Sequence, residues 1–206
     1  MLFRRFFSSV FIALLLISSF SLYALTLEQL QQKLMNQDLV RGEFLQSKTL
    51  KIFDQPLISQ GQFLLSHQQG LIWQQQNPFP VLLVLANNKL SQQFADQTPE
   101  VIESKDNPMV FYFSHLFLSL FKGDLNALND QFELTLNSIN KRWVLNLQPK
   151  SAPLNNIFST IEIQGIDQID KLTLIELNGD TTTISFTNIS DQPMQLSEQE
   201  KDVFTF

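Results

Sequence analysis

The feature that most constrains the fold is an alternation of apolar and polar side chains in short runs. In GQFLLSHQQGLIWQQQ (residues 61–76) every second residue falls on one face, namely Gly61, Phe63, Leu65 and His67 and, after a turn at residues 68–70, Leu71 and Trp73. A period of two is that of a β-strand. Comparable runs are VLLVLANNKLSQQF with a turn at Asn87-Asn88, QFELTLN, RWVLNLQP, FSTIEIQG, KLTLIELNGD and TTISFTNI. Their spacing predicts a large antiparallel sheet, in a mainly β fold with few helices.

Two segments depart from this alternation and predict helices. Thr26-Leu27-Glu28-Gln29 is similar to a capping box, and leucines follow it at helical spacing, which predicts an amphipathic helix over Thr26 to Asn36. The second segment is NPMVFYFSHLFLSLFKGD, residues 107–124. Its Asp106 or Asn107 can cap a helix that begins at Pro108, and Lys122-Gly123 is typical of a helix end.

The predicted helix over residues 108–121 is unusually apolar. Only His115, Ser119 and Lys122 form a narrow polar stripe. Fourteen residues span about 21 Å, which is shorter than the roughly 20 residues needed to cross a bilayer. One stripe contains Met109, Phe113, Leu116 and Leu120 with Phe117 beside it, and a second contains Phe111 and Leu118. The residues alone leave two alternatives, a core helix or a helix with one side on the sheet and another facing an apolar cavity for a ligand.

The N-terminus has the pattern of a secretory signal peptide. Arg4 and Arg5 precede an apolar run over residues 10–17 and a stretch of small residues that ends at Ala24. We expect cleavage near Ala24, with cleavage after Ser21 as an alternative and an uncleaved anchor as a further one. Residues 25–206 then form a single domain. Arg4 and Arg5 are the only charged residues of the leader, so the remaining 182 residues carry a formal charge of −8. A protein that binds nucleic acid would carry a charge of the opposite sign.

Motifs for catalysis or metal binding are missing from the sequence. The chain has no cysteine and two histidines, His67 and His115, without metal-ligand spacing. The carboxylates at strand ends and turns are expected to be solvated, and they are Glu162, Asp167, Asp170, Glu176 and Asp180. Ser114 and His115 point about 100° apart on a helix and do not form a dyad. We therefore expect no enzyme, cofactor or metal. A lipid-modifying enzyme and an outer-membrane β-barrel are the less favoured alternatives.

One region of about forty residues, VRGEFLQSKTL through QNPFP (residues 40–80), resembles the periplasmic outer-membrane lipoprotein carrier family (LolA-like). The resemblance lies in a Gly-x-Phe-x-Gln strand, a Ser-x-Gly-x-Phe strand and an aliphatic-x-Trp before a proline. These elements are Gly42, Phe44 and Gln46; Ser59, Gly61 and Phe63; and Leu71, Trp73 and Pro78. A central helical insertion, the text FKGDLNALNDQFEL and a final VFTF also stand where the family has counterparts.

The resemblance implies an incomplete antiparallel β-barrel with an N-terminal helix and a helical lid over an apolar cavity. In that arrangement Phe44, Phe63, Leu65, Leu71 and Trp73 line the lipid-binding cavity. The lid consists of Met109, Phe111, Phe113, Leu116, Phe117 and Leu120. The function it implies is that of a monomeric periplasmic carrier, which shields the acyl chains of a lipoprotein between an inner-membrane ATP-driven release complex and an outer-membrane acceptor.

Two departures from the family pattern are visible. In family carriers, an arginine six residues before the tryptophan holds the lid closed. This chain has His67 at that position, so we expect a latch that is weaker or depends on pH. The chain also ends at Phe206 after an expected FTF strand, without the C-terminal segment that many carriers add. Both departures favour, as an alternative, a LolA-like carrier of a glycolipid or another acylated product.

Overall fold

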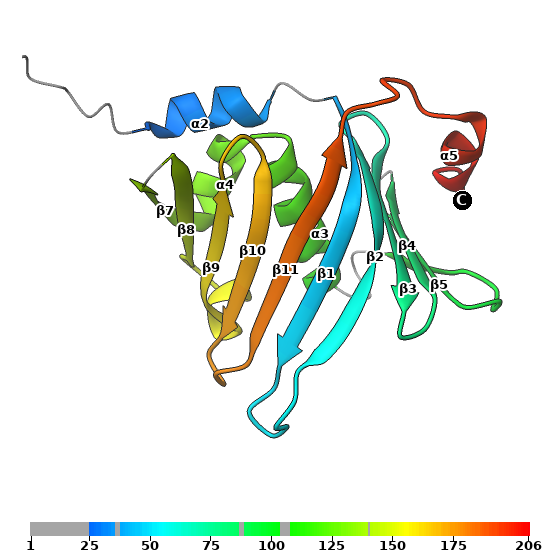
Figure 1. Ribbon diagram of the computed structural model, residues 1–206. Helices are drawn as coiled ribbons and strands as arrows, with labels where there is room; N and C mark the ends of the chain where they lie inside the picture. Colours follow the sequence, from blue (N-terminus) through cyan, green and yellow to red (C-terminus); the bar gives the residue numbers. More distant parts are fainter. Residues whose placement is uncertain (1–24, 36–37, 87–88, 104–107, 140) are drawn as a thin grey trace, which may run out of the picture.

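The computed structural model (Figure 1) describes residues 25–35, 38–86, 89–103, 108–139 and 141–206. It contains one antiparallel sheet of 11 strands in the order β6-β5-β4-β3-β2-β1-β11-β10-β9-β8-β7. The strands are β1 (Leu39–Thr49), β2 (Leu57–Ser66), β3 (Gly70–Asn77), β4 (Val81–Ala86), β5 (Lys89–Phe94), β6 (Glu100–Glu103), β7 (Phe132–Ile139), β8 (Arg142–Pro149), β9 (Phe158–Gly165), β10 (Ile169–Glu176) and β11 (Thr181–Ser190). β6 and β7 remain as free edges, so the predicted large antiparallel sheet is confirmed as an open, incomplete barrel.

The sheet consists of two meanders that meet at β1 and β11. Strands β1 to β6 follow one another outward in one direction, and β11 to β7 follow in the other. β1 and β11 pair from Glu43 opposite Thr187 to Thr49 opposite Thr181, with a bulge near the start of β1. Because β6 and β7 are adjacent in the sequence but lie at opposite edges, the chain between them must cross one face of the sheet. We call the crossed face the inner face.

The crossing segment contains the predicted apolar helix. It forms α3 (Pro108–Phe121), followed by α4 (Leu125–Gln131). Gly123 ends α3 with a φ of 65°, as predicted for a left-handed stop, and the Asp124 side chain caps α4 by accepting from the Ala127 N–H at 3.0 Å. In Figure 1, α3 and α4 lie behind the middle strands, and the sheet curves around them.

The N-terminal helix is also confirmed. α2 (Leu27–Leu34) begins with the predicted capping box, in which the Thr26 hydroxyl accepts from the Gln29 N–H and the Gln29 side chain accepts from the Thr26 N–H. Leu30 and Leu34 are buried in the main core, and α2 lies across the upper ends of the strands in Figure 1. A short 3₁₀ helix, η1 (Leu154–Asn156), precedes β9.

The expected FTF strand at the C-terminus is wrong. The segment before it forms a helix, α5 (Glu198–Val203), which begins with a capping box between Ser197 and Glu200. Phe204 packs on the face opposite α3, which we call the outer face, in a second apolar cluster. That cluster contains Leu39, Leu64, Ile72, Val84 and Ala86 together with Phe204. The capping box overrides the β-propensity of the Val-Phe-Thr-Phe text.

Candidate functional site

The predicted cavity residues form a continuous patch on the inner face. Phe63 is paired directly opposite Trp73, and Leu65 opposite Leu71, across β2 and β3. Phe44 is paired opposite Phe186 across β1 and β11. The parity inferred from the sequence is therefore confirmed, and it brings the residues of four strands onto one surface, where all but the half-buried Trp73 are buried.

Two glycines of the motif make this surface compact. A Cβ on Gly42 would lie 2.7 Å from Cε1 of the Phe63 ring, so only glycine leaves room for that ring beside β1. At Gly61 a Cβ would collide with the backbone carbonyl of Gln74 on the neighbouring strand. The glycines thus allow the aromatic rings and the strands to approach each other closely.

Phenylalanines of α3 pack on the patch through their rings. The Trp73 ring stacks on Phe44 with a centroid distance of 3.7 Å and meets Phe117 edge-on at 5.7 Å. Phe121 lies 5.7 Å from Phe63 and 5.5 Å from Phe186. We call these six rings the aromatic cluster, and its members are Phe44, Phe63, Trp73, Phe117, Phe121 and Phe186. At these contacts the space where a lipid cavity was expected is filled by the side chains of α3.

The outcome for the predicted lid residues is mixed. Phe111, Leu116, Phe117 and Leu120 are buried in the main core, while the side chains of Met109 and Phe113 lie outside the described residues. The predicted polar stripe is confirmed by His115, which is exposed, and by Ser119 and Lys122, which are half-buried. Phe111 of the second stripe is as buried as Leu116 and Leu120 of the first, whereas Leu118 of the second stripe is half-buried.

Two members of the aromatic cluster were not among the predicted site residues. Phe121 is the last residue of α3, and Phe186 lies on β11. Alternation with Ile184 places Phe186 on an apolar face, but its partner strand β1 is more than 130 residues away in the sequence. The sequence gives no local signal for that pairing, whereas Phe121 could have been included from its helical spacing with Phe117.

The contacts that hold α3 on the sheet are apolar. Phe117 and Phe121 meet the rings of the strands, and Phe111, Leu116 and Leu120 are buried in the same core. Each ring pair contributes about 0.5–1.5 kcal/mol beyond area burial, and burial of a phenylalanine side chain about 1.5–3 kcal/mol. Such contacts have little directionality, so another apolar group of suitable shape can replace them.

His67 lies beside α3, as the latch hypothesis requires. It follows β2 directly and lines a pocket of about 560 Å³ whose other walls include His115, Leu118, Ser119 and Lys122. Its backbone N–H donates to the Asp38 carbonyl at 3.0 Å, and its Nδ1 is 3.7 Å from Asp38 Oδ1. Within the described residues its Nε2 is buried without a hydrogen-bond partner. His67 and residues of α3 thus line one pocket without a described bond between them, and the latch role stays a prediction.

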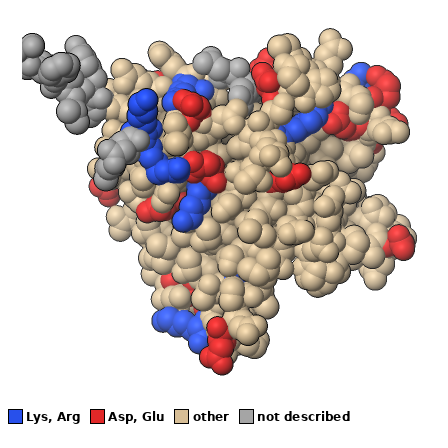
Figure 2. Space-filling view, viewed as in Figure 1, with Lys and Arg blue, Asp and Glu red and all other residues tan. Residues whose placement is uncertain are grey.

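Several charged side chains form ion pairs at the surface. Figure 2 shows acidic and basic residues interspersed over the upper part of one face. Lys33 Nζ lies 2.9 Å from Asp167, and Arg142 lies 2.7 Å from Asp170. No group of three or more potential metal ligands occurs in the part of the chain that the structure describes. None of the helices described there has the length and hydropathy to cross a bilayer.

Comparison with known proteins gives a family match. The model of the family described as outer membrane lipoprotein carrier protein LolA-like matches residues 20–188, which include the whole aromatic cluster. No curated protein sequence matches the chain.

Several solved structures are similar in outline. A LolA superfamily protein from Nitrosomonas europaea has 10% identity, with 88% of this chain and 98% of that chain covered and a TM-score of 0.44. A DUF1329 family protein from Desulfovibrio piger has 11% identity, with 84% and 92% covered and a TM-score of 0.46. A chain of the MucA/MucB complex of Pseudomonas aeruginosa has 13% identity, with 83% and 59% covered and a TM-score of 0.46.

Proposed function

The chain belongs to the outer membrane lipoprotein carrier protein LolA-like family, and from this premise we propose that it carries an acylated cargo with the acyl chains between the inner face and α3. The observation that carries the proposal is the aromatic cluster, in which Phe117 and Phe121 of α3 pack on rings of the sheet. In the empty protein α3 protects this apolar surface from water. When cargo binds, the acyl chains take the place of Phe117 and Phe121 on the patch.

The energetics of this exchange support reversible binding. Each acyl methylene moved out of water contributes about 0.8 kcal/mol, so a chain of ten or more methylenes offsets the loss of several ring contacts. The exchange replaces one apolar contact with another. The affinity of the carrier for the acyl chains is then high enough to keep them out of water. It is low enough to allow their transfer to an acceptor that binds them more tightly.

We place this activity in the periplasm. The cargo is the acyl moiety of a lipoprotein, received from an inner-membrane ATP-driven release complex and delivered to an outer-membrane acceptor. The protein acts as a monomer and leaves the cargo chemically unchanged, so it is a carrier and not an enzyme. The predicted leader over residues 1–24, which lies outside the described residues, is consistent with export.

His67 is proposed to tune the closing of α3. Its imidazole is next to the C-terminal end of the helix, where His115, Lys122 and Asp124 line the same pocket. A small movement of α3 would give the imidazole a partner on the helix. Histidine changes charge near neutral pH, so the proposed contact between His67 and α3 becomes dependent on pH.

Trp73 is the natural reporter of cargo binding. Its half-buried ring contacts both Phe44 and Phe117, so replacement of α3 by an acyl chain changes its surroundings. The other tryptophan, Trp143, is replaced by phenylalanine in this experiment, because its buried indole would obscure the signal. In the parent, the indole N–H of Trp143 donates to the carbonyl of Ile166. Because Ile166 is exposed, a water molecule can donate to this carbonyl once the indole is removed.

In the Trp143→Phe background, titration with an acylated peptide should shift or change the Trp73 emission in a saturable manner. The same peptide without its acyl group is the matched control and should have no effect. Unchanged Trp73 emission at saturating acylated peptide would contradict the proposed site. Mass spectrometry of lipid that copurifies with the protein would separate a lipoprotein cargo from a glycolipid, and altered lipid would point to an enzyme.

A further inference from the structure

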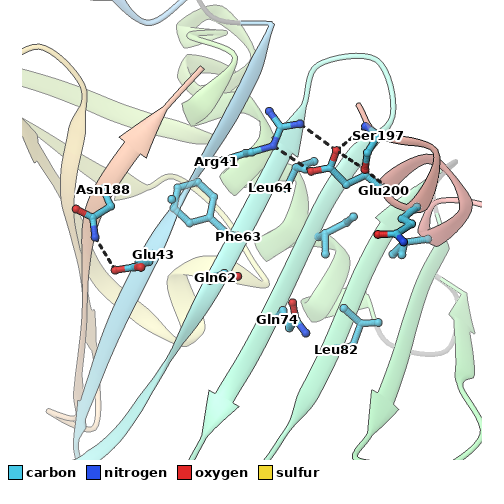
Figure 3. Close-up of a pocket in the computed structure, with 14 residues that line it drawn as sticks. Arg41, Glu43, Gln62, Phe63, Leu64, Gln74, Leu82, Asn188, Ser197 and Glu200 are labelled. Carbon is cyan, nitrogen blue, oxygen red and sulfur yellow. Dashed lines mark hydrogen bonds and ion pairs between the residues drawn. The ribbon is translucent and has the colours of Figure 1, made fainter. Parts of the chain in front are cut away.

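A second pocket lies on the outer face, opposite the proposed acyl site. It has a volume of about 560 Å³ and lies between α5 and strands β1 to β4 (Figure 3). Small-molecule sites in proteins have volumes of about 300–1,000 Å³ and combine apolar surface with a few placed polar groups. Of the residues that line this pocket, Phe63 alone also belongs to the aromatic cluster of the proposed acyl site.

Polar contacts hold both ends of the pocket in place. At one end the Arg41 guanidinium donates to both carboxylate oxygens of Glu200 at 3.0 Å, and it also donates to the carbonyls of Pro193 and Gln195. At the other end the Asn188 amide donates to Glu43 at 2.7 Å. The bidentate pair fixes α5 over the sheet, so this wall is formed before any ligand arrives.

The middle of the pocket has free hydrogen-bonding groups above an apolar floor. Leu64, Ile72 and Leu82 form the floor, and exposed glutamines lie around it. These glutamines are Gln62 on β2, Gln74 on β3 and Gln199 on α5. Their side-chain amides have no hydrogen-bond partner among the described residues, and each offers both donors and an acceptor. Gln62 is paired opposite Gln74, so two of these amides are adjacent.

The charge balance of the pocket selects against anionic ligands. The charges of Arg41 and Glu200 compensate each other, and their bonds occupy the guanidinium. Glu43 is the remaining charged lining residue, and a carboxylate repels anions while accepting hydrogen bonds from hydroxyl groups. The Asn188 amide already bonds the Glu43 carboxylate, and the free amides of the lining match a neutral molecule that both donates and accepts hydrogen bonds.

We propose that this outer-face pocket binds a neutral saccharide that carries N-acetylated sugar units. Sugar hydroxyls match the amides of Gln62, Gln74 and Gln199, because both partners donate and accept. The C–H face of the ring and the acetamido methyl group pack on Leu64, Ile72 and Leu82. The site lies on the face of the sheet opposite the aromatic cluster, so a saccharide and an acyl chain can be bound at the same time.

The test is calorimetric titration of the full chain with the trimer of N-acetylglucosamine. We expect saturable binding to one site that a Gln62→Ala/Gln74→Ala variant weakens about tenfold, since two hydrogen bonds of about 0.5–1.5 kcal/mol are lost. The matched control is Gln60→Ala/Gln76→Ala, which removes exposed glutamines of the same two strands outside the pocket. This control should bind as the parent does, and Gln199→Ala should weaken binding through a different element.

Three results would overturn the proposal. One is the lack of saturable binding by the parent chain, and another is an equal loss of affinity in the two double variants. The third is tighter binding of a capped trialanine peptide, which would make the pocket a peptide site. Acylated peptide at saturation should leave the sugar affinity unchanged, so the outcome here is separate from that of the carrier proposal.

Discussion

The two faces of the sheet are covered by helices that are held in different ways. On the inner face α3 contacts the strands through aromatic rings, and the centroids in four ring pairs between helix and sheet are 5.5–5.9 Å apart. On the outer face α5 is fixed by Arg41, whose guanidinium makes four hydrogen bonds to residues 193–200. Rings can be replaced by any apolar group of suitable shape, whereas the Arg41 bonds need a particular partner. The proposed function therefore requires an inner cover that is exchangeable, next to an outer cover that is fixed.

The largest effect is expected where the exchangeable cover is damaged. Phe117→Ala should lower the free energy of unfolding of the empty protein by about 3–5 kcal/mol, as large aromatic truncations in a core do. Because the variant weakens the cover that cargo displaces, an acylated peptide should raise its stability more than that of the parent. The measurement is chemical denaturation with and without the acylated peptide.

Phe132→Ala is the matched control for this experiment. Phe132 is fully buried in the same core but lies on β7 and is not part of the aromatic cluster. It should lose comparable stability and gain no more than the parent when the acylated peptide is added. Equal ligand gains in the two variants would mean that α3 is an ordinary part of the core.

A smaller and local effect is expected where the fixed cover is damaged. Arg41→Ala removes the guanidinium that donates to Glu200, Pro193 and Gln195. The free energy of unfolding should fall by about 1–3 kcal/mol, because a charged hydrogen-bonded group loses its partner. Hydrogen exchange of residues 193–204 should become faster. Affinity for the acylated peptide should stay as in the parent, and a marked loss would show that the two covers are coupled.

Acid should release the outer cover before the inner one. The hydrogen bond from Arg41 is the main cause that holds the pKa of Glu200 below its usual value of 4.5, with further contributions from Ser197 and from the Arg41 charge. A lowered pKa means that this stabilisation is present above pH 4.5 and is lost as the pH falls through the lower folded value. Hydrogen exchange at residues 198–204 should therefore rise in acid and change less in Glu200→Gln. Equal acid sensitivity of parent and variant would rule out this carboxylate as the cause.

The smallest effect concerns His67. In the parent, the release rate of the acylated peptide should vary between about pH 5 and 8, the range in which histidines change charge. Asp38, His115, Lys122 and Asp124 lie around the imidazole, so His115→Gln is measured as the control for the second histidine. A His67→Gln variant that keeps the pH dependence of the parent would remove His67 from the closing of α3.

Local sequence patterns predicted the elements of the site because local physics determines them. The alternation of Phe63, Leu65, Leu71 and Trp73 follows from the geometry of a strand, and the ends of α3 follow from Pro108 and Gly123. The capping box of α2 was likewise readable from Thr26. In each case the deciding contacts lie within a few residues along the chain.

The parts that were not predicted depend on contacts between distant residues. Phe186 joins the aromatic cluster because β11 pairs with β1, and nothing in either strand specifies that partner. α5 was missed although Ser197 and Glu200 have capping-box spacing, because the residues after it read as a strand. Its position depends on Arg41, which precedes Glu200 by 159 residues.

The exchange of α3 for an acyl chain can be measured directly as a distance. The chain has no cysteine, so spin labels attach only to cysteines that are introduced. The first pair is Tyr112→Cys on α3 with Gln60→Cys on β2, and both positions are exposed. A second pair, Gln199 on α5 with Gln60, serves as the reference. We predict that saturating acylated peptide lengthens the Tyr112–Gln60 distance and leaves the Gln199–Gln60 distance unchanged. An unchanged Tyr112–Gln60 distance with bound acylated peptide would contradict the account.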